Sequence, residues 1–243
     1  MGCFEDARDL VDHARAELPK IHQAYAQSLE AKEVKRHLLV EIKNLLENLR
    51  SALDFAAHGL FEKYGSSPKA SPNIYFPYAP LDRTRTDFEK SKRIEACIPG
   101  LAASRPDIVA ALMDMQHFGS GGHRWLPEFM DLNNENKHEH LTPQTRREKK
   151  ELRIGSGGAV ISMGEGARIS MGPGTSISFG GGAVIRGGQE FDVNRPPRVD
   201  GPATVEVIRW VSFHFESNDQ PVIPFLETAV EGVGSIVDEL RKM

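Results

Sequence analysis

Apolar residues recur in steps of three and four along the first sixty residues of the chain. This spacing places them on one face of a helix. The first series runs from Phe4 to Tyr25, and the second runs from Leu38 to Leu60 and ends near Gly65. We therefore expect two long helices paired as an antiparallel hairpin, whose seams could also pair with a second subunit in a homo-oligomer. Pro19 lies inside the first series and is expected to kink or split that helix.

The remaining helical patterns are shorter and are separated by breaks. Four prolines between Ser66 and Asp82 predict a loop. Helical spacing resumes at 84–97 and 106–117, and a further helix is expected from Trp125 to His140. Pro221 then opens a final helix over about 221–242, with apolar residues on one face.

Residues 151–190 form an internal repeat of eight, ELRIGSGG, AVISMGEG, ARISMGPG, TSISFGGG and AVIRGGQE. The third place of four successive units is isoleucine and the sixth is glycine, and the first, third and fifth places share one face of a strand. We expect short antiparallel strands near 159–163, 167–171, 175–179 and 183–186, with Ile161, Ile169 and Ile177 buried. The glycines are explained by turns rather than by phosphate binding, because no helix follows them. A longer strand is expected at 203–216.

Together these patterns predict an α+β protein in which a glycine-rich antiparallel β-meander is inserted before a C-terminal helix. The expected domains are a helical one over 1–145, joined by 221–242, and a β module over 150–216. The basic stretch 142–150 is interpreted as the connector between them, and its charges could also contact phosphates.

Composition narrows the classes of function only slightly. Charged residues make up 26% of the chain and the net charge is −4, so no general positive field points to nucleic acid. Two cysteines, Cys3 and Cys97, imply no disulfide framework and fit a reducing cytoplasm. No apolar run approaches the roughly 20 residues of a membrane span, so no membrane partner is expected. The start MGCFED resembles a myristoylation site, but Asp6 stands where serine or threonine is required.

Candidate chemistry gathers on the helix that begins at Trp125. Asn134, Lys137 and His138 are spaced i, i+3 and i+4 and therefore share one face of that helix. On the second long helix, Asp54 and His58 lie among apolar residues, where a carboxylate could hold a lysine or an imidazolium. The same face of this helix carries Lys43, Glu47 and Arg50 before Asp54, and these three are interpreted as exposed to solvent.

The segments LRSALDFAAHGL, YFP and LNNENKHEHL resemble a group of uncharacterised bacterial helical proteins related to the HEPN superfamily. The resemblance covers about residues 30–142 and implies a HEPN-like helical bundle that is commonly dimeric. Many HEPN domains are metal-independent ribonucleases of toxin–antitoxin, phage-defence or CRISPR systems, with a histidine four to six residues after an arginine. By this resemblance His138 is the motif histidine, but Asn133 and Asn134 occupy the region where the arginine is expected. Bare spacings of this kind occur elsewhere, for example Arg8 to His13.

The leading hypothesis is RNA cleavage without a metal or cofactor. In it His138 is the general acid or base, Lys137 and Asn134 stabilise the phosphate, and Asp54 orients Lys137 or His138. The rival hypothesis is a non-catalytic homo-oligomeric interaction module that uses the β repeat as a recognition surface. The polar cluster could also be a structural network between two helices. A metal bound by His138 and His140 is disfavoured, because residues i and i+2 of a helix point apart.

Overall fold

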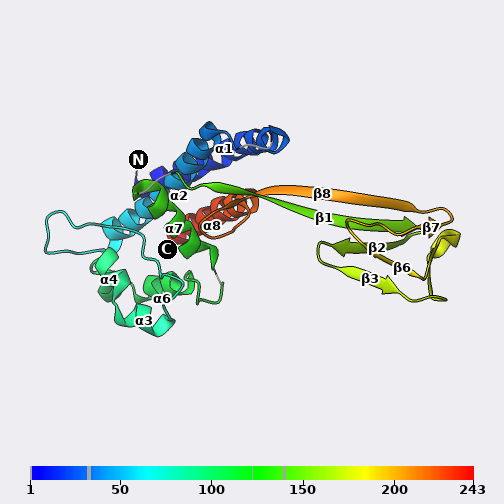
Figure 1. The fold of residues 1–243 in the computed structure, drawn as a ribbon. Coiled ribbons are helices and arrows are strands. Elements are labelled where there is room, and N and C mark those ends of the chain that lie inside the picture. Colours follow the sequence, from blue (N-terminus) through cyan, green and yellow to red (C-terminus); the bar gives the residue numbers. More distant parts are fainter. Residues whose placement is uncertain (1, 32–33, 122, 139–140) are drawn as a thin grey trace. The chain divides into compact units, whose positions relative to one another are not determined.

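The computed structural model describes residues 2–31, 34–121, 123–138 and 141–243, with the side chains of all of these except residues 30, 136–138 and 209–210. It is mixed, with helices and antiparallel sheets (Figure 1). The chain divides into two compact units. Unit 1 comprises residues 1–145 and 214–243, and unit 2 comprises residues 146–213.

Two long helices form the largest packed pair of unit 1. Helix α1 spans Cys3–Ala31 and α2 spans Arg36–Tyr64, and the two pack against each other. Pro19 lies inside α1, which continues past it as one helix, so of the predicted kink or split the split does not occur. Helix α2 ends at Tyr64 with Gly65 as its C-cap, as the sequence predicts. The apolar seam of α2 is buried along its length, at Leu38, Ile42, Leu45, Leu46, Leu49, Ala52, Leu53, Ala56, Ala57, Gly59 and Leu60.

Two further helices pack onto α2. Helix α7 spans Trp125–His138 and α8 spans Val222–Lys242, and each contacts α2 and the other. Pro221 is the N-cap residue of α8, as expected from a residue that lacks a backbone N–H. No helix in the described part of the chain is long and apolar enough to cross a membrane.

The stretches predicted as two helices, 84–97 and 106–117, contain three short ones, and a fourth lies between the two stretches. They are α3 Arg85–Lys90, α4 Arg93–Cys97, α5 Leu101–Ser104 and α6 Pro106–Asp114. Lys92 and Gly100 separate the first three, and both have positive φ, at 51° and 82°. A residue in the left-handed conformation ends a right-handed helix. The spacing of the apolar residues does not mark these ends, so the sequence predicts longer helices than the structure contains.

Unit 2 is built from eight strands, of which β1 begins before its first residue, at Gln144, and β8 ends after its last residue, at Phe215. The strands are β1 Gln144–Ser156, β2 Ala159–Gly164, β3 Arg168–Met171, β4 Ser176–Ser178, β5 Val184–Arg186, β6 Gln189–Asp192, β7 Val199–Asp200 and β8 Thr204–Phe215. The strands predicted from the repeat are therefore confirmed as β2 to β5. The basic connector predicted at 142–150 is wrong, because β1 begins at Gln144.

The strands pair antiparallel, but successive repeats do not form one meander. The three sheets have the orders β2-β1-β8, β3-β6 and β4-β5-β7. Strand β3 pairs with β6, where Ile169 faces Phe191, and not with β2 or β4. Successive octads do pair as β1 with β2 and as β4 with β5, but β3 pairs with β6, which extends beyond the repeat, so the octads predict where strands lie and only some of their partners.

The eighth place of the octad requires a residue with positive φ. Gly158, Gly166, Gly174 and Gly182 occupy it, and all four have φ between 82° and 86°. A side chain at these positions is strained, although nothing lies within 4 Å of an added Cβ. By contrast, the sixth-place Gly164, Gly172 and Gly180 do not have positive φ, and only in the last octad does the sixth place, Gly188, have it, at 81°.

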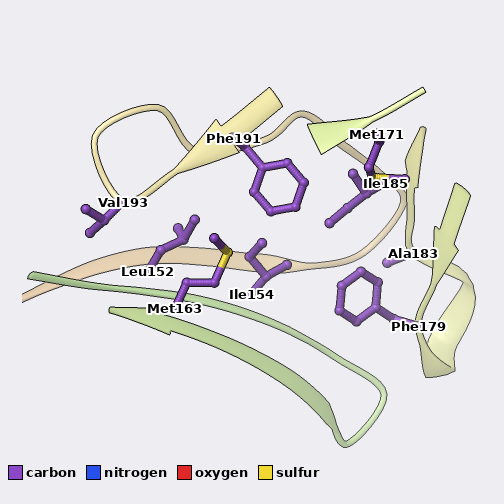
Figure 2. Packing of buried hydrophobic residues seen from close by; sticks show 9 residues of the cluster. All are labelled: Leu152, Ile154, Met163, Met171, Phe179, Ala183, Ile185, Phe191 and Val193. Carbon is purple, nitrogen blue, oxygen red and sulfur yellow. The ribbon is translucent and has the colours of Figure 1, made fainter. Parts of the chain in front are cut away.

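The core of unit 2 is a cluster of nine side chains drawn from five strands and the segments beside them (Figure 2). Its members are Leu152, Ile154, Met163, Met171, Phe179, Ala183, Ile185, Phe191 and Val193. Three of them, Met163, Met171 and Phe179, hold the fifth place of successive octads. The third-place residues Ile161, Ile169 and Ile177 pack against the cluster but are only half-buried, so the burial predicted for them on one face is found only in part.

Candidate functional site

A polar groove lies between α2, α7 and the loop that follows α2. The loop is held to α2 by Asp54, whose Oδ1 accepts a hydrogen bond from the backbone N–H of Phe76 at 2.8 Å. Phe76 is buried, whereas the preceding Tyr75 is 50% exposed. This alternation is expected of extended backbone, where neighbouring side chains point to opposite sides.

A second polar side chain holds the other end of this loop. Gln116, which is 1% exposed, accepts a hydrogen bond from the N–H of Ala79 at 2.9 Å and donates one to the carbonyl of Pro77 at 3.2 Å. A buried amide whose donor and acceptor are both satisfied fixes the backbone that it contacts. Tyr75 and Tyr78 are therefore presented on an ordered loop.

Arg50 lies one turn before Asp54 on α2, and its side chain is 22% exposed. Its Nε donates to Asp54 Oδ2 at 3.3 Å, and an Nη1 hydrogen contacts the sulfur of Met130 on α7. The guanidinium carbon also lies 5.7 Å from the centre of the Tyr78 ring, within the range of a cation–π contact. Arg50 thus joins α2, α7 and the loop.

Helix α7 contributes two neighbouring amides. Asn133 is 5% exposed, and its Nδ2 donates to the carbonyl of Phe129 at 2.9 Å. Among the described residues, the Oδ1 of Asn133 is buried and has no hydrogen-bond partner. Asn134 is exposed, and its Nδ2 lies 3.4 Å from the Tyr78 hydroxyl. A buried carbonyl oxygen without a partner costs about 1–3 kcal/mol.

These side chains line a groove of about 350 Å³. Its lining residues are Glu47, Asn48, Arg50, Ser51, Asp54, Tyr75, Asn133 and Asn134. The lining carries one guanidinium and two carboxylates, and Glu47 is paired with Lys43 at 2.7 Å. The groove therefore presents hydrogen-bond donors and acceptors and little net charge.

The groove brings together two of the four predicted site residues, Asp54 and Asn134. Lys137 and His138 come three and four residues after Asn134, at the end of α7, and their side chains lie outside the described residues. The predicted contact of Asp54 with Lys137 or His138 therefore stays a prediction.

Arg50 is the residue that sequence reasoning missed, because the charged line 43–50 was interpreted as solvated. Its i, i+4 spacing to Asp54 was a usable signal, since an aspartate at the margin of an apolar stripe favours a cation one turn away. What the spacing could not indicate is that Met130 and Tyr78 close around the guanidinium.

Two other chemistries gain no support from the described residues. No group of three or more histidine, cysteine, aspartate or glutamate side chains there could hold a metal ion. Of the histidines considered for a metal, the side chain of His138 and the whole of His140 fall outside that part of the chain. Burial raises the pKa of the Cys97 thiol, an effect that nearby Arg93 opposes and Asp54 reinforces, so this thiol is a poor nucleophile near neutral pH.

Comparisons of the chain with models of protein families, with curated proteins and with solved structures found no match.

Proposed function

We propose that the protein binds single-stranded RNA in the groove around Arg50 and cleaves it without a metal, as a HEPN-like ribonuclease. The observation that carries the proposal is the placement of Arg50. The sequence lacks an arginine four to six residues before His138, and Arg50 brings a guanidinium from α2 to α7, the helix that ends at His138.

The groove has the size and the groups that one nucleotide requires. Pockets for small ligands typically enclose about 300–1,000 Å³, and this groove encloses about 350 Å³. The exposed ring of Tyr75 offers a stacking surface for a base, and stacking tolerates any base. The exposed Asn134 amide, which lines the groove, can donate to and accept from the edge of the base.

Arg50 would bind the phosphate. A guanidinium has five N–H donors, and the hydrogen bonds described for Arg50 use two of its nitrogens, Nε to Asp54 and Nη1 to Met130. Asp54 acts as a positioning residue, because it holds both Arg50 and the backbone of the loop that carries Tyr75.

The cleavage step assigns roles to the two residues at the end of α7. As general base, His138 takes the proton of the ribose 2′-hydroxyl, whose oxygen attacks the adjacent phosphorus. The bond from phosphorus to the 5′-oxygen breaks, that oxygen takes up a proton from water, and the products are a 2′,3′-cyclic phosphate and a 5′-hydroxyl. Arg50, Lys137 and Asn134 stabilise the charge that develops on the phosphate.

Cleavage of a short fluorescent single-stranded RNA in excess EDTA tests this function. We expect the wild-type protein to cut it, His138→Ala to abolish cutting, and Arg50→Lys, which keeps the charge but loses the planar fork, to slow it about tenfold or more. Arg36→Lys is the matched control, because Arg36 is exposed at the start of the same helix. Failure of the wild-type protein to cut any single-stranded RNA, or equal rates for the two arginine variants, would contradict the proposal.

A second candidate, homo-oligomerisation through unit 2, is favoured by exposed apolar side chains there. Val160 on β2 and Val205 and Val207 on β8 are 66%, 38% and 41% exposed. Strand β8 is the last strand of its sheet, and such an edge can pair with another strand. We expect Val205→Lys with Val207→Lys to shift a dimer to monomer in light scattering. An unchanged mass, or a wild-type monomer at high concentration, would exclude this interface.

A further inference from the structure

Unit 1 contains a larger groove that the proposed RNA site does not use. It encloses about 580 Å³ between α3, α4, α5 and α6. Its floor is apolar and includes Phe88, Ile94 and Met113, all nearly buried, while Ala102, Pro106 and Ala110 lie exposed along it. Its volume lies within the range of pockets that hold small molecules.

The charged residues around this groove are not equally engaged. Glu89 pairs with Arg85 at 3.2 Å. Glu95 accepts hydrogen bonds from the backbone N–H groups of Gly100 at 2.8 Å and Ala102 at 3.3 Å. Both carboxylates are therefore already neutralised or satisfied within the protein.

The two remaining cations, Lys92 and Arg93, are exposed, and no ion pair joins either of them to another described residue. Lys92 also has φ 51° and ψ 34°, in the left-handed region that lysine rarely adopts. This conformation places Lys92 at the break between α3 and α4, at the rim of the groove. The groove thus combines an apolar floor with unengaged positive charge at its rim.

We propose that this groove binds an amphipathic monoanion, an alkyl-chain carboxylate whose tail lies over Phe88 and Met113 and whose head group meets Lys92 and Arg93. A neutral amphiphile would leave the cations without a partner, and a cationic one would be repelled by them. This inference is independent of the RNA proposal, because the two grooves share no lining residue.

Displacement of anilinonaphthalene sulfonate from the full chain, followed by calorimetry with unlabelled ligands, tests the chemistry of the ligand. Decanoate is expected to bind more tightly than decanol, and decyltrimethylammonium is expected not to compete. Along hexanoate, octanoate and decanoate, each methylene that enters the groove should tighten binding about fourfold. Competition by decyltrimethylammonium equal to that of decanoate would overturn the proposal, since it would indicate a face that accepts any apolar partner, including a second copy.

Variants locate the site. Ala110→Trp fills the groove from an exposed position and should abolish decanoate binding, whereas Ala103→Trp, on an exposed alanine that does not line the groove, should not. Lys92→Gln and Arg93→Gln should each weaken decanoate about two- to fivefold and leave decanol unchanged, because exposed ion pairs are individually weak. Lys90→Gln is the control for loss of charge. Decanoate affinity that is unchanged in Ala110→Trp, or in the double variant of Lys92 and Arg93, would overturn the proposal.

Discussion

Units 1 and 2 bury their cores by different means. Unit 1 uses the long apolar seams of α1, α2 and α8, where leucines such as Leu38, Leu49 and Leu53 are completely buried. Unit 2 has strands of two to thirteen residues, nine core side chains and a left-handed glycine at each octad turn. Unit 1 has a large core, so it stays folded although the buried Asn133 Oδ1 has no hydrogen-bond partner. Unit 2 has a small core, so each core side chain and each turn contributes a larger fraction of its free energy of unfolding.

The largest expected effect comes from the core of unit 2. Phe191→Ala removes a side chain that is 1% exposed and should destabilise the unit by about 3–5 kcal/mol. Hydrogen exchange should then show lost protection across 146–213, while the amides of α2 keep theirs. Val160→Ala, at a position that is 66% exposed, is the control. Retained protection around Phe191 would mean that unit 2 is not held by this cluster.

Removing the Asp54 carboxylate from unit 1 should lower the free energy of unfolding by a smaller amount. Asp54→Ala leaves Arg50 and the N–H of Phe76 without their partner and should cost about 2–3 kcal/mol in chemical denaturation. Asp54→Asn keeps an acceptor for Phe76 and should cost less, and Glu41→Ala, exposed on the same helix, should cost almost nothing. An unchanged unfolding midpoint for Asp54→Ala would contradict the role assigned to this carboxylate.

Two glycines of one octad distinguish the effect of positive φ from the effect of steric crowding. Gly166 has φ 84° and Gly164 does not have positive φ, and nothing lies within 4 Å of an added Cβ at either position. Gly166→Ala should therefore destabilise unit 2 by about 1–2 kcal/mol. Gly164→Ala should be neutral or stabilise it by up to about 1 kcal/mol, because it restricts the unfolded chain. Equal effects in thermal unfolding would show that the eighth place has no special conformational requirement.

The smallest expected effect is a pH dependence at the start of α3. The Thr84 hydroxyl and backbone N–H donate to the Asp87 carboxylate and hold its pKa below the usual 3.8. Because the folded pKa is the lower one, this capping box contributes stability above the unfolded pKa and loses it as pH falls through the folded pKa. Thr84→Ala should raise the Asp87 pKa in an NMR titration, whereas an unchanged midpoint would assign the shift to another cause.

The sequence predicts an element well where one physical requirement governs it. The seam of α2 and strands β2 to β5 follow from periodicity alone, because burial on one side forces a period of 3.6 or 2. The strand β1 escapes this reasoning: its first half, including Arg146, Arg147 and Lys149, is mostly exposed, so no alternation marks it. The pairing of β3 with β6 could not be predicted either, because β6 continues past the last octad of the repeat.

Of the candidate site, the sequence predicts the residues whose place on a helix is unusual and misses the one whose place is not. Asp54 and Asn134 stand at the margins of helical stripes, where a polar residue is conspicuous. Arg50 lies in a run of charges that looks solvated, and only the approach of α7 and the loop makes it half-buried. Its place in the groove is a tertiary property that no spacing within α2 contains.

RNA affinity in the non-cleaving His138→Ala background tests the central claim, that the groove at Arg50 is an RNA site, most directly. Fluorescence anisotropy should show that adding Arg50→Lys weakens binding of a single-stranded RNA about tenfold or more, because lysine keeps the charge but loses the planar fork that makes two parallel hydrogen bonds to a phosphate. Adding Arg36→Lys should leave the affinity unchanged. Equal affinities for these two double variants, or no RNA binding at all, would contradict the account.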